Sequence, residues 1–371
     1  MCKKISIFLA FLCLLPAFAL SIYAIDTSAK GAVLIEGDSA QIIYEKNAHS
    51  PLPMASTTKI MTAIVVIENC NNLDKKYKIP KDAIGTEGSS IYLKDGEELT
   101  IRELLYALLL ESANDASVAL AIISSGSVEC FVEKMNEKAC ELGLLATHFE
   151  NPHGLDDENH YSSAYDLAIL SKYALSNPIF SEIVSTKKMT IPLNNGEGTR
   201  VLINHNKLLR LYDGANGVKT GFTKRTGRCL VSSSKRDGVW LIAVTLNDPN
   251  DWRDHTALFD YGYELYTSVN LAEMGDYLIE LPLQNGKKST VLCTNLEPLS
   301  VTLKKDDINI SARLEYIRPI FAPVSKGMVL GRVVFYNNDE EIGSLDLVST
   351  EEIKNIDYKN FFERLFTNGK D

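Results

Sequence analysis

Ser56-Thr57-Thr58-Lys59 opens a run of apolar residues from Ile60 to Ile67, and this stretch decides how the rest of the sequence is interpreted. The run predicts a helix that begins near Ser56 and continues through Ile67. On a helix, the i, i+3 spacing places the amine of Lys59 over the same face as the hydroxyl of Ser56. A serine hydroxyl is a weak nucleophile that needs a base within hydrogen-bonding distance. The stretch favours a nucleophilic serine beside a lysine base; the alternative is that Ser56 or Thr57 only caps the helix.

The base assignment makes a prediction about electrostatics. A lysine accepts a proton near neutral pH only when its pKa falls from ~10.4 toward ~7–8. Burial lowers the pKa of a lysine, and a second cation facing the same cleft lowers it further. Lys219 is the candidate for that second cation, so we expect Lys59 to be buried close to it.

Two further motifs follow in a fixed order, Ser112-Ala113-Asn114 and Lys219-Thr220-Gly221. The order is more informative than any single motif, because the same Ser/Lys spacing recurs at Ser185–Lys188 and Ser232–Lys235. We expect both of these copies to be structural. The first falls in a Thr/Lys-rich surface strand, and the second falls in a strand ahead of the Asp237-Gly238 turn. Ser112-Ala113-Asn114 alone could also be a plain helix-to-helix turn.

The three motifs resemble the S-x-x-K, S-x-N and K-T-G set of penicillin-binding proteins and serine β-lactamases. The segments Asn151-Pro152-His153-Gly154-Leu155 and Gly217-Val218-Lys219-Thr220-Gly221-Phe222 resemble the low-molecular-mass penicillin-binding proteins of the D-alanyl-D-alanine carboxypeptidase type. The resemblance extends from about Ala29 to Tyr266. It implies an α/β (α+β) fold, in which helices flank an antiparallel sheet, and acyl transfer through a serine ester.

The resemblance also implies roles for the motif residues. Ser56 is the acylated residue, and Ser112 relays a proton between Lys59 and the leaving amine. Asn114 offers its amide to the backbone of the substrate. Lys219 meets the terminal carboxylate of the substrate.

The remaining roles implied by the resemblance concern the third motif. The oxyanion hole is formed by the backbone N–H groups of Ser56 and Phe222, the residue after Gly221. Thr220 hydrogen-bonds the substrate carboxylate. Arg253, within Asp251-Trp252-Arg253-Asp254, stands where the family often carries an arginine near that carboxylate; a surface salt bridge is the alternative.

Several enzymes share this machinery. The expected reaction is removal of the last D-alanine from peptidoglycan stem peptides ending in D-Ala-D-Ala, with β-lactam antibiotics acylating the same serine. D,D-endopeptidase action on cross-links is a close alternative, and a catalytically idle wall-binding module is a more distant one. A class A β-lactamase needs a further glutamate. Glu133 is the nearest match, and the helical spacing of Phe131, Met135 and Ala139 predicts that it faces solvent.

Composition excludes other classes of function. The 371 residues suffice for two domains, and the net charge of −10 argues against a nucleic acid partner. His148, His153 and His160 match no common zinc spacing, so neither a metal nor a cofactor is expected. Beyond residue 24 five cysteines remain, with no close spacing, and we interpret them as buried apolar residues rather than a disulfide framework.

Residues 1–24 have the features of a secretory signal peptide. Lys3 and Lys4 precede an apolar run from Ile5 to Leu15, and small residues follow. The expected location is therefore outside the cytoplasm, at the outer face of the cytoplasmic membrane or in the cell wall. A retained signal anchor is the alternative.

Local patterns divide the rest of the chain. We expect a catalytic domain over residues 25–270, with hairpins at residues 32–45 and 228–246 and helices at 101–110, 131–142, 163–175 and 251–266. Recurring short strands predict a small all-β domain over residues 275–349. Residues 351–371 form an amphipathic tail whose apolar face, Tyr358 to Phe366, suits a membrane surface. The alternative is a helix docked on the β domain.

Overall fold

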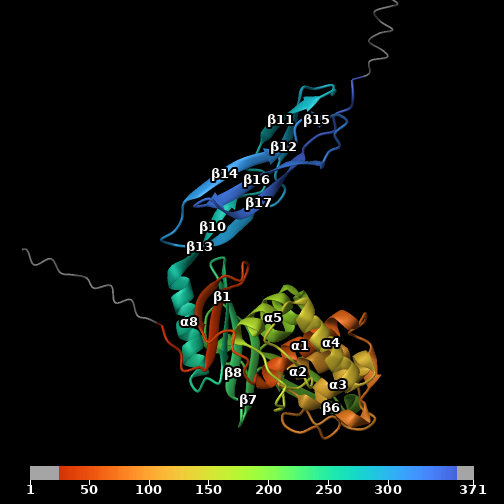
Figure 1. Cartoon of the computed structure of the whole chain (residues 1–371). Coiled ribbons are helices and arrows are strands. Elements are labelled where there is room, and N and C mark those ends of the chain that lie inside the picture. Colours follow the sequence, from red (N-terminus) through yellow and green to blue (C-terminus); the bar gives the residue numbers. More distant parts are fainter. Residues whose placement is uncertain (1–24, 357–371) are drawn as a thin grey trace, which may run out of the picture.

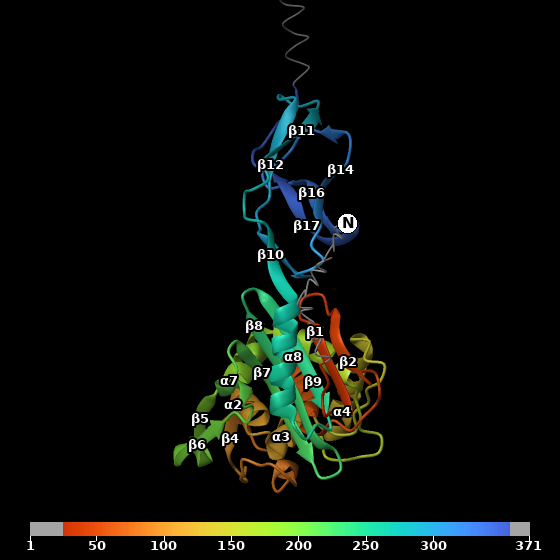
Figure 2. The same ribbon diagram turned by 90° about the vertical axis from the view of Figure 1, so that its left-hand side faces the viewer.

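The structure, a computed structural model, describes residues 25–356. Figures 1 and 2 show an elongated molecule in which a domain of helices and one sheet carries a slender all-β domain at one end. We call these the helix–sheet domain (residues 25–265) and the β domain (residues 266–356). The helix α8 (Asp251–Leu265) runs directly into strand β10 (Tyr266–Ala272), so the connection between the domains is continuous secondary structure.

The helix–sheet domain is built on a five-stranded antiparallel sheet in the order β2-β1-β9-β8-β7. Its strands are β1 (Gly31–Glu36), β2 (Ile42–Lys46), β7 (Ala215–Thr223), β8 (Gly227–Arg236) and β9 (Val239–Leu246). Both expected hairpins are present. Strand β1 is buried over its whole length, because Val33 and Ile35 pack against the helical side while Leu34 packs on the side of α8.

The remaining helices lie on both faces of the sheet. Leu208 shares a buried cluster with Leu258 and Phe259 of α8 on one face, and the helices between Lys59 and Ser185 cover the opposite face (Figures 1 and 2). The remaining helices are α1 (Lys59–Asn69), α2 (Ile101–Leu110), α3 (Asn114–Ser125), α4 (Val128–Glu141), α5 (Ala164–Ser176), α6 (Pro178–Ser185) and the short α7 (Leu208–Leu211). Short 3₁₀ turns occupy Ala55–Thr58, Lys81–Ala83 and Asn194–Gly196. Two ribbons, β3 (Lys76–Lys78) with β4 (Glu98–Thr100) and β5 (Lys188–Leu193) with β6 (Gly198–Ile203), flank the helices.

The expected antiparallel sheet flanked by helices is confirmed, and several local predictions hold. Thr100 and Glu103 form a complete capping box at the start of α2. Phe131, Met135 and Ala139 form the buried face of α4. The Ser185–Lys188 copy is different from our expectation, because Ser185 ends helix α6 before β5 begins at Lys188.

The β domain has a six-stranded sheet in the order β14-β16-β17-β12-β11-β15 and a two-stranded β10-β13 pair. The strands are β11 (Ile279–Gln284), β12 (Thr290–Thr294), β13 (Leu299–Lys304), β14 (Ile310–Tyr316), β15 (Ile320–Phe321), β16 (Val329–Asn337) and β17 (Glu340–Ser349). The all-β C-terminal domain is confirmed, whereas strand β10 was not predicted from the sequence. That strand pairs with β13, so β structure begins at Tyr266, directly where α8 ends.

The cysteine prediction was partly wrong. Cys229 and Cys293 are buried, but Cys130 and Cys140 are exposed on α4. Both lie away from the face that Phe131, Met135 and Ala139 bury, because a helix with one apolar stripe leaves its remaining positions in solvent. Within residues 25–356, no single helix has the length and apolar character needed to cross a membrane; the bent pair α3 and α4, at 86°, meets that test by length and composition only.

Candidate active site

Ser56 lies in the 3₁₀ turn that leads into α1, and Lys59 is the first residue of that helix. Nζ of Lys59 is 3.1 Å from Oγ of Ser56, as the spacing predicted. The same amine lies 2.7 Å from Oδ1 of Asn114 and 2.6 Å from the carbonyl oxygen of His153. Three acceptors therefore fix Lys59 in place beside the serine.

Lys59 is 0% exposed, and burial lowers its pKa well below 10.5. The nearby cation Lys219 lowers the pKa further, while the carboxylate of Asp115 opposes the shift. Burial also lowers the pKa of Lys219, to about 7. The direction agrees with the sequence expectation. A neutral Lys59 has a lone pair that can accept the hydroxyl proton of Ser56, so the geometry and the pKa suit the same role.

Ser112 follows α2 after one intervening residue, Glu111, and is held in the left-handed region at φ 60°. Such a conformation costs a non-glycine residue about 1–2 kcal/mol, and it persists only where the surroundings impose it. Here Nζ of Lys219 donates to Oγ of Ser112 at 3.0 Å and to the carbonyl oxygen of Thr220 at 2.9 Å. The second and third motifs are thus joined by a direct hydrogen bond inside the site.

Asn114 is oriented differently from the expectation that its amide faces substrate. Its Oδ1 accepts from Lys59, and its Nδ2 donates to the carbonyl oxygen of Glu87 at 2.6 Å. The side chain is 4% exposed. In this structure Asn114 positions the base and the loop around Glu87, because both ends of its amide are already engaged.

Asp115 supports the site from outside the cavity lining, and the sequence analysis did not single it out. Its buried carboxylate accepts hydrogen bonds from Oγ of Ser90 and from the backbone N–H groups of Ile91 and Leu93, at 2.6–3.2 Å. It therefore fastens the loop that carries Ser89, a cavity residue, to the start of α3. An acidic residue in the first turn of a helix was the available sequence signal, but its partners lie more than twenty positions away.

Gly221 allows β7 to approach the nucleophile closely. A Cβ at this position would lie 3.0 Å from the carbonyl oxygen of Met54 and 3.1 Å from the backbone nitrogen of Ser56, so a larger residue would push the strand away. Thr220 and Phe222, on either side of Gly221, both line the cavity. The close approach brings strand β7 to the N–H of Ser56, one of the two expected oxyanion donors.

His153 and His160, two of the histidines that match no zinc spacing, lie close to the catalytic motifs. Nε2 of His160 lies 2.7 Å from Oγ1 of Thr58, and Nδ1 accepts from the backbone of Glu150. Burial lowers the pKa of His153 to about 3 and that of His160 to about 4, so both are neutral at pH 7. Among the described residues, no group of three or more His, Cys, Asp or Glu side chains is placed to hold a metal ion.

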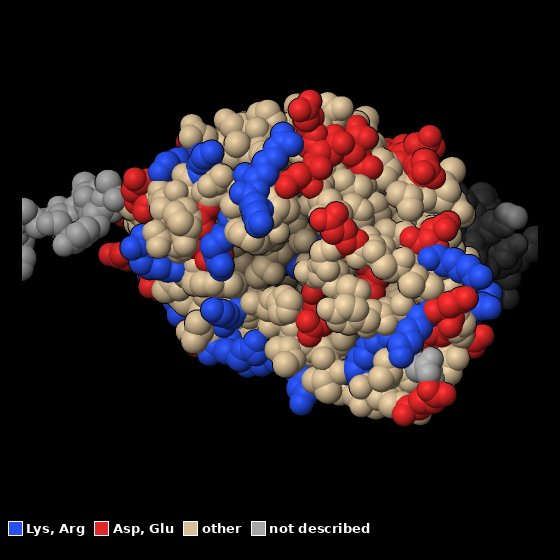
Figure 3. All heavy atoms as spheres, turned by 90° about the horizontal axis from the view of Figure 1, so that it is seen from below, with Lys and Arg blue, Asp and Glu red and all other residues tan. Residues whose placement is uncertain are grey.

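A cavity of about 510 Å³ opens in front of these residues. It is lined by Ser56, Ser89, Ser112, Ile203, Asn204, His205, Lys207, Arg210, Thr220, Gly221, Phe222, Arg228, Asp251 and Trp252. Seen from below, the helix–sheet domain is hollowed, and Lys and Arg side chains gather along one side of the hollow (Figure 3).

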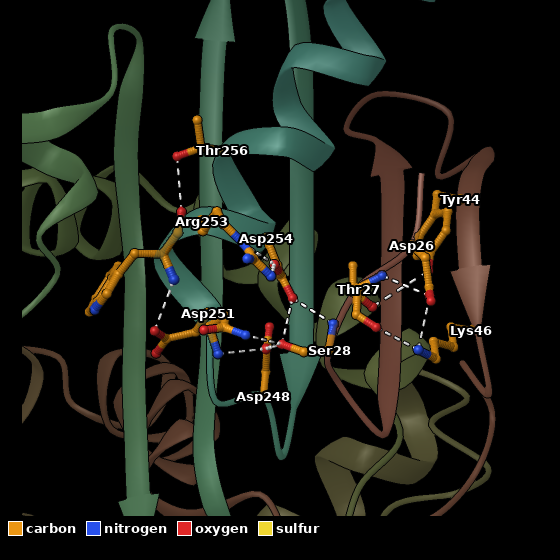
Figure 4. A network of polar contacts seen from close by, with 12 residues as sticks. Asp26, Thr27, Ser28, Tyr44, Lys46, Asp248, Asp251, Arg253, Asp254 and Thr256 are labelled. Carbon is orange, nitrogen blue, oxygen red and sulfur yellow. Dashed lines mark hydrogen bonds and ion pairs between the residues drawn. The ribbon is translucent and has the colours of Figure 1, made fainter. Parts of the chain in front are cut away.

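Arg253 is not brought to the cavity, contrary to the expectation. Its guanidinium binds Asp254 at 3.1 Å and its side chain is 74% exposed. Figure 4 shows this pair within a network in which Ser28 also binds Asp254 and Asp248. Successive residues on a helix point about 100° apart, so when Trp252 faces the cavity Arg253 faces away. The arginines that do line the cavity are Arg210 and Arg228, and the sequence analysis singled out neither of them.

The fold and the site together define a serine enzyme in which a buried lysine contacts the hydroxyl of the serine. Comparison with known proteins agrees with this class. The D-alanyl-D-alanine carboxypeptidase family model matches residues 19–250, and the model of the C-terminal domain of penicillin-binding protein 5 matches residues 266–355. The chain belongs to the D-alanyl-D-alanine carboxypeptidase family of serine peptidases.

Individual relatives cover nearly the whole chain. D-alanyl-D-alanine carboxypeptidase DacF of Bacillus subtilis is 35% identical over 91% of this chain and 88% of its own length. DacC of Escherichia coli is 31% identical over 93% of this chain and 88% of its own length. Among solved structures, the chain resembles PBP3 of Streptococcus pneumoniae, with a TM-score of 0.77, 26% identity and coverage of 89% of this chain and 100% of that one.

Proposed function

We propose that this protein removes the terminal D-alanine from peptidoglycan stem peptides ending in D-Ala-D-Ala, and that β-lactams acylate the same serine. The observation that carries the proposal is the 3.1 Å contact between Nζ of Lys59 and Oγ of Ser56 in a buried site that lowers the lysine pKa. Membership of the D-alanyl-D-alanine carboxypeptidase family supports the choice of substrate.

The first step is acylation. Lys59 takes the hydroxyl proton of Ser56, and Oγ attacks the carbonyl carbon of the penultimate D-alanine. The carbonyl oxygen becomes negative and is held by the N–H groups of Ser56 and Phe222. Ser112 relays the proton from Lys59 to the departing nitrogen, the C–N bond breaks, and D-alanine leaves. Thr220 and Lys219 hold its carboxylate.

The second step is hydrolysis of the ester. A water molecule gives a proton to Lys59 and attacks the acyl carbon. Lys59 then returns that proton to Oγ of Ser56 as the ester bond breaks. The shortened peptide departs as a carboxylic acid and the enzyme is regenerated. Glu133 is exposed on α4, so it does not supply the deacylating glutamate of a class A β-lactamase.

The reaction is tested by incubating the protein with a pentapeptide ending in D-Ala-D-Ala and measuring free D-alanine. Mass spectrometry of the penicillin-treated protein should place one adduct on Ser56, and Ser56→Ala should abolish it. Ser185→Ala is a matched control, since this serine has the same spacing to a lysine but its hydroxyl binds the carbonyl oxygen of Glu182. An adduct that survives Ser56→Ala removes the assignment. Adduct formation without D-alanine release favours an idle module.

We also propose that the catalytic residues need only the helix–sheet domain. All site residues lie before Tyr266, and β10 pairs with β13 rather than with the sheet of the helix–sheet domain. A protein that ends at Leu265 keeps α8 complete and should still bind penicillin covalently. Folded protein without an adduct would mean that the β domain completes the site.

We further propose that the protein is exported and held at the outer face of the cytoplasmic membrane. The expected signal, residues 1–24, and the apolar part of the tail, from Tyr358, lie outside the described residues. Residues 351–356 belong to the β domain, because Ile353 pairs with Val324 and Asn355 with Gly286. They lie at the end of that domain farthest from the active site (Figures 1 and 2). A tail anchored there would hold the active site away from the membrane.

Vesicle co-sedimentation tests the anchor. The protein lacking residues 1–24 should sediment with lipid, and the same protein ending at Ile356 should not. The charges of residues 357–371 balance, so sedimentation should depend little on anionic lipid. Equal sedimentation of both forms would remove the anchor and favour a tail docked on the β domain.

A further inference from the structure

The cavity continues beyond Ser56 and Ser112 along the segment from Ile203 to Arg210. Ser112, which protonates the departing nitrogen in the proposed reaction, directly follows Glu111. The carboxylate of Glu111 accepts from the backbone N–H of Ile203 at 2.5 Å and lies 3.2 Å from Nε2 of His205. The segment from Ile203 to Arg210, which we call the leaving-side segment, is therefore fastened beside the proton donor.

The leaving-side segment is held firmly. Asn204 donates to the carbonyl oxygens of Val184 and Thr186, both at 3.1 Å. Asn206 donates to the carbonyl oxygen of Gly217 at 2.6 Å, at the start of the strand that carries the third motif. Both asparagines are at most 2% exposed. The backbone from which Lys207 and Arg210 extend is thus fixed before a substrate arrives, which reduces the entropy lost on binding.

Two cations of this segment face the cavity without a carboxylate partner. Lys207 and Arg210 line the cavity, and within residues 25–356 neither forms an ion pair. Nη2 of Arg210 donates to the carbonyl oxygen of Asn204 at 2.8 Å, and Nζ of Lys207 lies 5.9 Å from the ring centroid of Trp252. The single acid among the lining residues, Asp251, is already bound by Arg228 at 2.8 Å.

An unbalanced pair of cations in a cavity fits an anion that the ligand supplies. The terminal carboxylate of D-alanine is next to the scissile nitrogen, and Lys219 and Thr220 already bind it in the proposed reaction. A second carboxylate must therefore belong to a larger leaving group. We propose that Lys207 and Arg210 form a leaving-group subsite for amines longer than D-alanine that bear a carboxylate several bonds from the nitrogen.

This inference rests on the proposed function and names a second substrate class for the same site. A cross-link whose acceptor strand ends at the diamino acid is an amide of that kind, because its leaving amine is the side chain of that residue and the free carboxylate of the same residue lies several bonds away. The bond changes are those of the first reaction: the C–N bond breaks, the amine takes a proton through Ser112, and water hydrolyses the Ser56 ester. The subsite therefore favours D,D-endopeptidase action alongside carboxypeptidase action.

The test uses four synthetic amides that share one D-alanyl acyl group. Their leaving groups are D-alanine, D-alaninamide, ε-aminocaproate and the carboxamide of ε-aminocaproate. The measured quantity is the ratio of kcat/KM for each carboxylate to that for its carboxamide, so a change in the shared chemistry cancels. The full-length protein should prefer ε-aminocaproate over its carboxamide by about tenfold. This ratio corresponds to the summed free energies of two partly exposed charge contacts.

We call the ratio for ε-aminocaproate the long-chain ratio and the ratio for D-alanine the short-chain ratio. In the double variant Lys207→Gln, Arg210→Gln the long-chain ratio should fall to about one, while the short-chain ratio should fall much less. The matched control is Lys224→Gln, Arg225→Gln, which removes two exposed cations outside the cavity lining and should keep the long-chain ratio. A ratio near one in the wild-type protein overturns the subsite, as does a ratio that survives the double variant. Equal loss of both ratios would assign the two cations to the terminal carboxylate instead. Failure to release D-alanine from the short substrate would separately reject the proposed function.

Discussion

Replacing Lys219 by methionine should stabilise the helix–sheet domain at pH 6 while it weakens acylation. Lys219 is 1% exposed, and burial lowers its pKa from 10.5 to about 7. Below pH 7 the folded protein holds this cation at a cost of about 5 kcal/mol relative to the unfolded chain. Methionine has a similar shape and no charge, but it loses the hydrogen bonds to Ser112 and Thr220, worth about 1–3 kcal/mol together. The expected net gain is about 2–4 kcal/mol at pH 6.

The pH dependence of the free energy of unfolding provides a second test of the same prediction. The folded pKa of Lys219 lies below the unfolded one, so between about pH 7 and 10.5 the unfolded chain binds more protons than the folded protein. The free energy of unfolding therefore rises with pH in that window. Lys219→Met removes this contribution, and the slope should fall by up to about 1.4 kcal/mol per pH unit.

Urea unfolding at pH 6 and pH 9, followed by tryptophan fluorescence, measures both effects. Trp240 and Trp252 are the two tryptophans of the chain, and both lie in the helix–sheet domain, so the signal reports that domain. Lys224→Met, at an exposed turn position, is the matched control and should change neither the stability nor the slope.

The rate of acylation by penicillin tests the functional effect of Lys219→Met. Lys219 is one of the causes of the low pKa of Lys59, so its loss should raise that pKa and move the acid limb of the acylation profile to higher pH. A variant that is less stable than the wild-type protein at pH 6 and keeps the wild-type slope would refute the reasoning. It would show that Lys219 does not carry a desolvated charge in the folded protein.

Further variants test single features of the structure. Lys59→Arg should lose acylation by several orders of magnitude in stopped-flow penicillin binding, because a guanidinium does not release its proton; near-wild-type rates would exclude the base role. Asp115→Asn should raise KM for the pentapeptide more than it lowers kcat, since it loosens the loop that carries Ser89; an unchanged KM would contradict this. Thr100→Ala should cost about 1 kcal/mol in urea unfolding through loss of the capping box, and no change would count against it. Thiol reagents should label Cys130 in the native protein, and full protection would place it in an interface.

The sequence by itself determined the features that depend on neighbouring residues. The capping box of Thr100 and Glu103 sets the start of α2. The length of that helix then places Ser112 just after its end. The helical spacing of Phe131, Met135 and Ala139 identified the buried face of α4. The Ser56–Lys59 contact followed from i, i+3 geometry alone. Backbone periodicity and capping act within one or two turns, so they can be recognised without knowing the fold.

Tertiary structure decided the partners of each polar group. Asn114 faces Lys59 and Glu87 rather than the cavity, because segments distant in sequence pack around it. Asp115 acquires its role only when the loop from Ser90 folds onto α3. Arg253 turns to Asp254 because the orientation of α8 against the sheet places Trp252 in the cavity. Burial and long-range contacts set the desolvation and the available partners of a side chain, and residue order along the chain fixes neither of them.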